Sequence, residues 1–253
     1  MRRLIIGSLF AICSMTVGVQ PVFAETEATQ ADSISTDLHQ AKSIMLAGIL
    51  NSEWIIIGDD KSDVKAEALM LELLASDPDL TELEQDYPGV AREMAKASLP
   101  IISKYSRQRL PDLHARQSAL YRANFSESEL DVLIKFYSSP TGQKMIIAML
   151  ENIKPDAMIE EAKGSEDFRI SAGSALKDIS RTVPSIMDTM NNVDVKVIQA
   201  LMETGLPFRM QTIGPQTQQI ALDWMNESAP GEDKELEDAA LATITRRKEQ
   251  ASK

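Results

Sequence analysis

Apolar residues return every three or four positions along most of the chain, which is the spacing of one buried helix face. Two such stripes follow each other between residues 126 and 153: Leu130, Leu133, Ile134 and Tyr137, then Ile146, Met149, Leu150 and Ile153. The β-like run Trp54-Ile55-Ile56-Ile57 is interpreted as a buried extended piece or the end of a helix. The pattern predicts an all-α fold: an array of short helices with proline breaks and a central two-helix corner at 126–153.

Prolines are expected to divide this array, because a proline inside a helix removes a backbone hydrogen bond and its ring clashes with the preceding turn. We predict kinks or breaks at Leu99-Pro100, Leu110-Pro111 and Pro184, and a new helix after Gly214-Pro215. Helix caps are expected from polar residues that precede apolar runs. These are Thr36 or Asp37, Asp77 and Asp194.

The central corner begins with the signals of a capped helix. Ser126 is followed three residues later by Glu129, the spacing of a capping box in which each side chain binds the backbone N–H of the other residue. Phe125 before the cap and Leu130 at the fourth helical position are spaced as a hydrophobic staple. We therefore predict a helix that starts directly after Ser126.

The second half of the corner ends one helix and starts the next. The residue before a proline is pushed out of the α region, so Ser139 is expected to cap a helix whose first residue is Pro140. Gly142 lacks a side chain, which lets a neighbouring helix approach closely. Phe136 and Tyr137 add aromatic rings, so we expect dense core packing here, with a ligand or partner groove as the alternative.

This window resembles the signature of a known family. The runs Phe-Ser-Glu-x-Glu-Leu at 125–130 and Phe-Tyr-x-Ser-Pro-x-Gly-Gln-Lys at 136–144 are similar to those of the bacterial family catalogued as domain of unknown function 2059. The similarity covers about residues 119–163, under a fifth of the chain. The resemblance implies an exported, helical bacterial protein, and it brings no catalytic residues.

The first 24 residues have the composition of a secretory signal peptide. Met1-Arg2-Arg3 is basic, residues 4–19 are predominantly apolar and uncharged, and the sequence up to Ala24 suits cleavage after that residue. We therefore expect the mature protein in the periplasm or outside the cell. A retained membrane anchor is the alternative, for which the apolar stretch is short.

Removal of residues 1–24 leaves a cysteine-free, more acidic mature chain. Cys13 is the only cysteine, so the mature chain depends on its hydrophobic core and not on disulfides. The leader carries two arginines and no acid, so the net charge moves from −12 to about −14. Such a chain repels phosphate backbones, which argues against nucleic acid as a partner. No further apolar run has the length of a membrane-spanning helix.

The mature chain is expected to have three parts. Residues 25–35 are polar and small, typical of a disordered lead-in. Residues 36–230 form the helical domain. Residues 231–253 start acidic and end basic, which suits a helix dipole. Because the apolar face of this last segment is thin, we expect a solvated, loosely attached helix or tail.

The sequence contains no recognisable metal or cofactor motif. His39 and His114 each lack a second ligand residue three or four positions away, so no helical zinc site is expected. The acidic loop at 59–63 does not continue as an EF-hand, because Val64 and Met70 stand where that loop needs Gly and Glu. We therefore assign no metal and no cofactor.

Candidate catalytic groups are equally sparse. Ser-x-x-Lys occurs at Ser62–Lys65 and Ser174–Lys177, without the Ser-Asp-Asn or Lys-Thr-Gly motifs of penicillin-recognising enzymes. The neighbouring carboxylates Glu160 and Glu161 diverge on a helix and are expected to be solvated. We assign no catalytic residue, and a hydrolase that uses a Ser–Lys pair or dispersed carboxylates stays as the alternative.

Methionine offers one route to binding, since its flexible side chain adapts to varied apolar partners. Core filling is the competing interpretation. The candidates for a groove that takes a peptide or acyl chain are Met145, Met149 and Met158, or Met187 and Met190. The working hypothesis is an exported soluble helical protein that binds a partner protein or apolar ligand in the periplasm. A structural envelope component is a further alternative.

Overall fold

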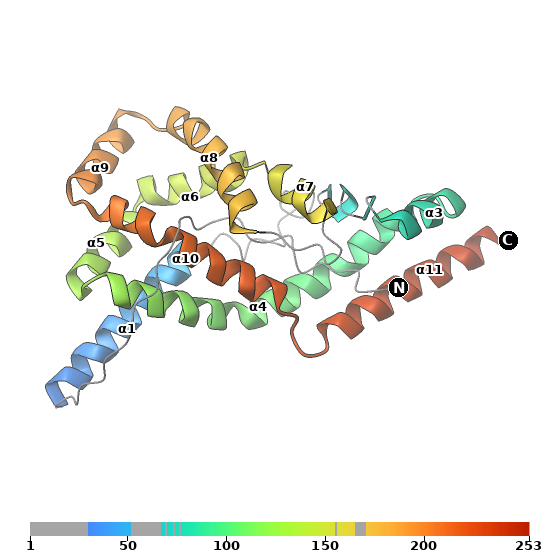
Figure 1. The fold of residues 1–253 in the computed structure, drawn as a ribbon, viewed down its shortest axis with the longest axis horizontal. Coiled ribbons are helices and arrows are strands. Elements are labelled where there is room, and N and C mark those ends of the chain that lie inside the picture. Colours follow the sequence, from blue (N-terminus) through green and yellow to red (C-terminus); the bar gives the residue numbers. More distant parts are fainter. Residues whose placement is uncertain are drawn as a thin grey trace.

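The computed structural model describes residues 30–51, 67–68, 70–72, 74–75, 77–154, 156–164 and 171–252, and within them it contains helices and no strand (Figure 1). The all-α fold class is therefore confirmed. The helices are α1 (Gln30–Leu50), α3 (Pro78–Asp86), α4 (Val90–Asn124), α5 (Glu127–Tyr137), α6 (Pro140–Asn152), α7 (Asp156–Gly164), α8 (Ala172–Asp188), α9 (Asn192–Glu203), α10 (Leu206–Asn226) and α11 (Glu232–Ala251).

Several predictions lie outside the described residues and stay predictions. They concern the signal peptide at 1–24, the apolar run at 54–57, the acidic loop at 59–63 and the pair Ser62–Lys65. In contrast, α1 can be compared with its prediction. It begins at Gln30, before the caps expected at Thr36 or Asp37 and inside the lead-in expected to be disordered.

Helix α4 is the element against which the other long helices pack (Figure 1). Its first half packs with α3 and α11 around a core cluster that includes Val90, Met94 and Ile244. Its second half packs with α1, α5 and α10 around Tyr121, and with α10 alone around Leu113. The helices α6 to α9 form a second group on the side of α10 away from α4 (Figure 1).

The helices do not break at the predicted prolines, and no new helix begins directly after Pro215. Helix α4 is 35 residues long and runs through Pro100 and Pro111, α8 runs through Pro184, and α10 runs through Pro215. Pro100, Pro111 and Pro184 are exposed, so their rings face solvent and the freed carbonyls can bind water. Packing of the opposite faces thus outweighs the local cost, and the array is built on long helices rather than only on short ones.

Helices α4 and α10 are antiparallel, and each supplies an arginine to the C-terminal end of the other. Arg109 of α4 donates to the carbonyl of Trp224, and the indole N–H of Trp224 donates back to the carbonyl of Arg109 at 3.1 Å. Arg209 of α10 donates to the carbonyl of Asn124 and lies over the ring of Phe125, 5.0 Å from its centroid. Both guanidinium groups therefore satisfy carbonyls that have no partner within their own helix.

The C-terminal segment is helical, but it is not loosely attached as expected. Leu236 and Ile244 of α11 are buried against α4. Glu93 of α4 accepts from Arg246 at 3.0 Å and forms an ion pair with Arg247 at 2.6 Å. The two buried side chains and this charged contact hold α11 against α4. Its thin apolar face had instead predicted a helix surrounded by solvent. Among the described residues, the helices that are long enough to cross a membrane are too polar to do so.

Replacement of Pro100 or Pro111 by alanine should stabilise the protein, because each proline is exposed and lies inside a continuous helix. Proline costs roughly 3 kcal/mol relative to alanine in a helix interior. We expect the free energy of unfolding to rise by roughly 1–3 kcal/mol in either variant. Urea denaturation followed by circular dichroism measures the change.

The matched control is Pro140→Ala, since Pro140 is also exposed but occupies the first position of α6, where proline is well suited. This variant should stay within about 0.5 kcal/mol of the parent protein. A loss of stability in both α4 variants would show that the helix is interrupted at these positions in solution.

Candidate functional site

The start of the α5–α6 corner has the capping geometry that its sequence predicts. The Glu129 carboxylate accepts from the backbone N–H of Ser126 at 2.8 Å, and the Ser126 hydroxyl accepts from the N–H of Glu129 at 3.4 Å. Phe125 and Leu130, the two residues of the expected staple, lie buried in one apolar cluster with Tyr121. The entry of the chain into α5 is thus fixed by polar contacts on one side and apolar contacts on the other.

The turn from α5 to α6 is held by side chains that bind both helix ends. The Ser139 hydroxyl donates to the carbonyl of Phe136 at 2.6 Å and accepts from the N–H of Gly142 at 3.2 Å. The side-chain amide of Gln143 donates to the carbonyl of Tyr137 at 2.6 Å. These contacts satisfy carbonyls at the end of α5 and an N–H at the start of α6.

Gly142 permits the start of α6 to lie against the end of α5. A Cβ atom at this position would lie 2.2 Å from the carbonyl oxygen of Phe136 and 2.6 Å from the Cα of Tyr137. Both atoms belong to the backbone, which cannot move aside as a flexible side chain can. Pro140, at the first position of α6, fixes the helical entry that brings Gly142 there.

Asp194 joins this corner to α9. Its carboxylate accepts from the ammonium of Lys144 at 2.8 Å, from the hydroxyl of Thr141 at 2.9 Å and from the N–H of Asn191 at 3.0 Å. The hydrogen bond from Lys144, followed by those from Asn191 and Thr141, lowers the pKa of Asp194 to about 2. The cap of α9 is Asn191 and not Asp194 as expected, since Asp194 occupies the third helical position of a capping box.

The family-like signature is therefore a joint between α5, α6 and α9. The hydroxyl of Ser139 and the amide of Gln143 bind helix ends, and the ammonium of Lys144 binds Asp194. A nucleophile or general acid instead needs a polar atom that faces the substrate. Ser139, Gln143 and Lys144 instead bind groups that hold the helices together, which gives these three residue types a structural role.

The two histidines do not come together. The Nε2 atom of His39 lies 2.8 Å from the carbonyl oxygen of Phe125, at the end of α4. His114 lies beside Gly48, nine residues further along α1, which corresponds to roughly 13 Å along the helix axis. Burial lowers the pKa of His114. In the described parts of the chain, no three potential metal-ligating side chains form a group.

The Ser174–Lys177 pair is not assembled as a nucleophile and base. The Ser174 hydroxyl is hydrogen-bonded to Glu161 and to the carbonyl of Ser171, whereas the side chain of Lys177 is exposed. Burial raises the pKa of Glu161, but hydrogen bonds from Ser174 and Ser171 outweigh it, so the pKa lies below its usual value. A carboxylate with a lowered pKa is a poorer base. The neighbouring carboxylate of Glu160 is exposed and forms an ion pair with Lys163.

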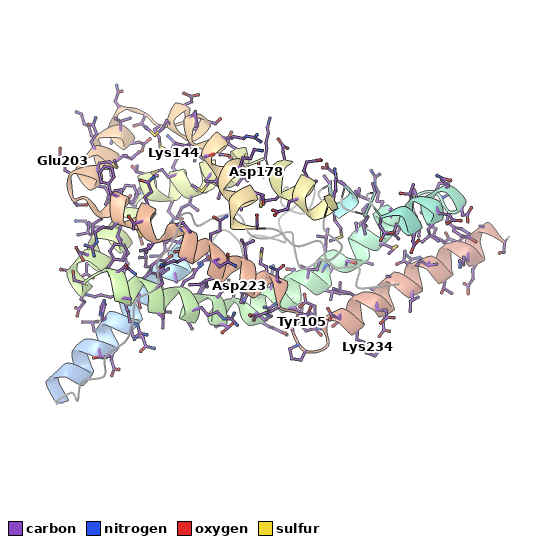
Figure 2. The ribbon with its side chains drawn as sticks, viewed as in Figure 1. Tyr105, Lys144, Asp178, Glu203, Asp223 and Lys234 are labelled. Carbon is purple, nitrogen blue, oxygen red and sulfur yellow. The ribbon has the colours of Figure 1, made fainter. Side chains whose placement is uncertain are left out.

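Sequence reasoning missed Asp178, a carboxylate on α8 that is 1% exposed. It accepts from the backbone N–H groups of Ala157, at 2.9 and 3.0 Å, and of Met158, at 3.0 Å. Asp178 thereby caps the start of α7 from a distant point in the chain. The available signal was an acid on the apolar face of α8, next to the buried residues Ala175 and Ile179. Figure 2 shows Lys144 and Asp178 in the group formed by α6 to α9.

The methionine candidates divide between core and surface. Met158 is 2% exposed and belongs to the core, which corrects its proposed place in a groove, whereas Met187 is exposed. Met145, Met149 and Met190 are half-buried. Three valines of α8 and α9 are exposed as well. We call this set the α8–α9 ridge, and it consists of Val183, Met187, Val193 and Val197.

Gly142→Ala should destabilise the protein, because the new Cβ would overlap the backbone at the end of α5. Overpacking of this kind costs on the order of 1–3 kcal/mol. The matched control is Gly173→Ala, in the first turn of α8, where the nearest atom to a new Cβ is 3.6 Å away. The control should gain roughly 0.5–1 kcal/mol, because alanine restricts the unfolded chain. Equal behaviour of the two variants in urea denaturation would refute the close approach at Gly142.

The Asp194 cap should make stability fall in acid. Because the pKa of Asp194 is lowered from 3.8 to about 2 in the folded protein, its contribution is complete above 3.8 and is lost as the pH falls through about 2. Asp194→Asn lacks this titration. The urea midpoints of the parent protein and the variant should therefore approach each other between pH 4 and pH 2, and a constant gap over this range would contradict the role of Asp194.

The comparison with protein families agrees with the resemblance in the corner. A family model described as an uncharacterized protein conserved in bacteria (DUF2059) matches residues 111–163. This segment is about a fifth of the chain, and it runs from the last part of α4 through α5 and α6 into α7. The chain matches no curated protein and no solved structure. Residues 111–163 are thus similar to a bacterial family, and the similarity predicted from residues 119–163 is confirmed.

Proposed function

We propose that this protein is an exported helical protein that binds a partner protein through the α8–α9 ridge. The observation that carries the proposal is the exposure of four large apolar side chains on two consecutive helices. Val193 is 69% exposed, and none of the other three is less than 37% exposed. Single apolar residues on a surface are ordinary, but a group of them marks an interaction site.

The spacing of the ridge residues gives each of the two helices one exposed apolar side. Val183 and Met187 are four residues apart on α8, and Val193 and Val197 are four apart on α9, so each pair lies on one side of its helix. The buried apolar residues of α8, which include Ala175 and Ile186, form a separate stripe beside this exposed pair. The ridge is therefore additional to the apolar surface that the fold itself buries.

Lys177 of α8 and Lys196 of α9 are exposed on the two helices of the ridge, which favours a partner with acidic residues. Four lysines of the described chain have neither an ion pair with its described carboxylates nor a contact with an aromatic ring, and all belong to the part from α5 to α9: Lys135, Lys154, Lys177 and Lys196. Lysines elsewhere in the described chain are paired, as in Lys42 with Glu127 and Lys104 with Glu235, or stacked, as in Lys248 over Tyr87. The partner that fits is a protein segment with an apolar helix face flanked by carboxylates.

The predicted signal peptide supports a periplasmic site for this interaction. The corner between α5 and α6 supports a binding role rather than a catalytic one, because its polar groups already bind helix ends. In the same way Ser174 is engaged with Glu161 and not with Lys177. No observation favours the hydrolase over the binding protein.

Site-specific photocrosslinking in intact cells tests the proposal. A photoreactive amino acid in place of Val193 should give an adduct of defined mass, because this side chain is the most exposed of the ridge. The matched control places the same amino acid at Leu241 of α11, which is 42% exposed and lies outside the ridge. That position should give no such adduct.

Two further variants make the test specific. Met187→Ser removes apolar contact and Lys196→Glu reverses a charge, and each should reduce the adduct formed at position 193 while leaving the circular dichroism spectrum unchanged. Both residues are exposed, so neither substitution disturbs the core. Absence of an adduct at 193, or an adduct that both variants leave intact, would rule out the ridge as the contact face.

A further inference from the structure

A layer of buried polar side chains lies where α1, α4 and α10 meet, between two apolar clusters. One cluster contains Tyr121 and Ile213, and the other contains Leu113 and Leu222. Each of the six polar residues between them is buried or half-buried. They are Asn51, directly after α1, then His114, Gln117 and Ser118 of α4, and Thr217 and Gln218 of α10.

Part of this layer is satisfied by direct hydrogen bonds. The side-chain amide of Asn51 donates to the carbonyl of Ala47 at 2.6 Å and to the side-chain oxygen of Gln117 at 2.7 Å. The hydroxyl of Ser118 donates to a carbonyl of its own helix. The hydroxyl of Tyr121 is hydrogen-bonded to Thr217. These bonds join α1 to α4 and α4 to α10 at one level.

The two glutamines have more hydrogen-bonding capacity than their described neighbours use. Gln117 and Gln218 are both 0% exposed. Within the described chain, the amide nitrogen of Gln117 and both polar atoms of the Gln218 side chain have no partner, and the same holds for Nε2 of His114. Buried amides are almost always hydrogen-bonded, because their removal from water is otherwise unfavourable.

The register of the helices brings these groups to a common level. Helices α4 and α10 are antiparallel, with the indole N–H of Trp224 on the carbonyl of Arg109 at one end. At the other end, Tyr121 is bonded to Thr217, the neighbour of Gln218. Gln117 lies one turn from Tyr121, and Asn51, directly after α1, donates to the side-chain oxygen of Gln117. The unused donors and acceptor therefore belong to one layer and not to scattered sites.

We propose that this layer is an internal hydration site, in which ordered water shared by Gln117 and Gln218 completes the hydrogen bonds between α1, α4 and α10. The chemistry of the lining selects water. The described side chains of the layer are carboxamides, hydroxyls and an imidazole whose pKa burial lowers, and none of them carries a carboxylate or an ammonium group that would balance a bound ion. Both glutamines are closed off from bulk solvent, and buried water makes about three hydrogen bonds to such groups.

The layer also has a structural consequence. Apolar contacts are not directional, so two continuous apolar faces can slide past each other. A polar layer that is satisfied at only one alignment fixes the register of the helices, as a buried asparagine does in coiled coils. The site therefore holds α1 and α10 at one position along α4.

Nuclear magnetic resonance on the isotope-labelled full chain tests the proposal. Cross-relaxation with water should appear at the side-chain NH₂ protons of Gln117 and Gln218, with a water residence time longer than the tumbling time of the protein. Gln218→Leu should abolish this signal at Gln117. The matched control is Gln219→Leu, because Gln219 is an exposed neighbour on α10 that binds Asp223, and this variant should leave the signal unchanged.

The result for the parent protein decides the question even where a variant fails to fold. Water that exchanges faster than tumbling at both amides would overturn the proposal. So would an organic molecule that copurifies with the protein, is seen by native mass spectrometry and gives the cross-relaxation in place of water. A signal at Gln117 that persists in a folded Gln218→Leu variant would show that the two glutamines do not share a site.

Discussion

Helix ends are the constraint on which the rest of this fold depends. Every helix leaves N–H groups at its start and carbonyls at its end without an intrahelical partner. Here, side chains from other helices supply many of the partners: Arg109 and Arg209 at C-terminal ends, and Asp178 at an N-terminal end. Such bonds are directional, whereas apolar contact is not. They therefore determine how the helices are placed, while the apolar clusters provide the driving force for burial.

The same constraint explains the segment that matches the bacterial family. Residues 111–163 contain the place where the end of α5, the start of α6 and the start of α9 come together through Gly142, Gln143 and Lys144. These residue types follow from helix capping and close approach. The proposed contact face on α8 and α9 lies outside the matched segment. The matched segment therefore bears on how this corner is built and not on the proposed contact face.

Sequence alone predicts those caps whose two partners are close in the chain. The capping box of Ser126 and Glu129 spans three residues and can be recognised from spacing. Asp178 and its partner Ala157 are 21 positions apart, so no local pattern joins them. Pro100 shows the reverse case. Its presence in the sequence strongly predicts the end of a helix, but tertiary packing keeps α4 continuous. Prediction therefore succeeded within single elements and failed where two elements decide the outcome together.

Polar anchoring also explains how apolar side chains can stay on the surface of α9. Asp194 and Leu201 are the buried residues of this helix, and Asp194 is held by Lys144 and Thr141 of α6. Because a carboxylate fixes the start of α9, the helix does not need to turn its valines inward to be held in place. Val193 can then face solvent one position before the anchor. A helix attached in this way presents an apolar surface in a fixed orientation, which is the property that a binding face requires.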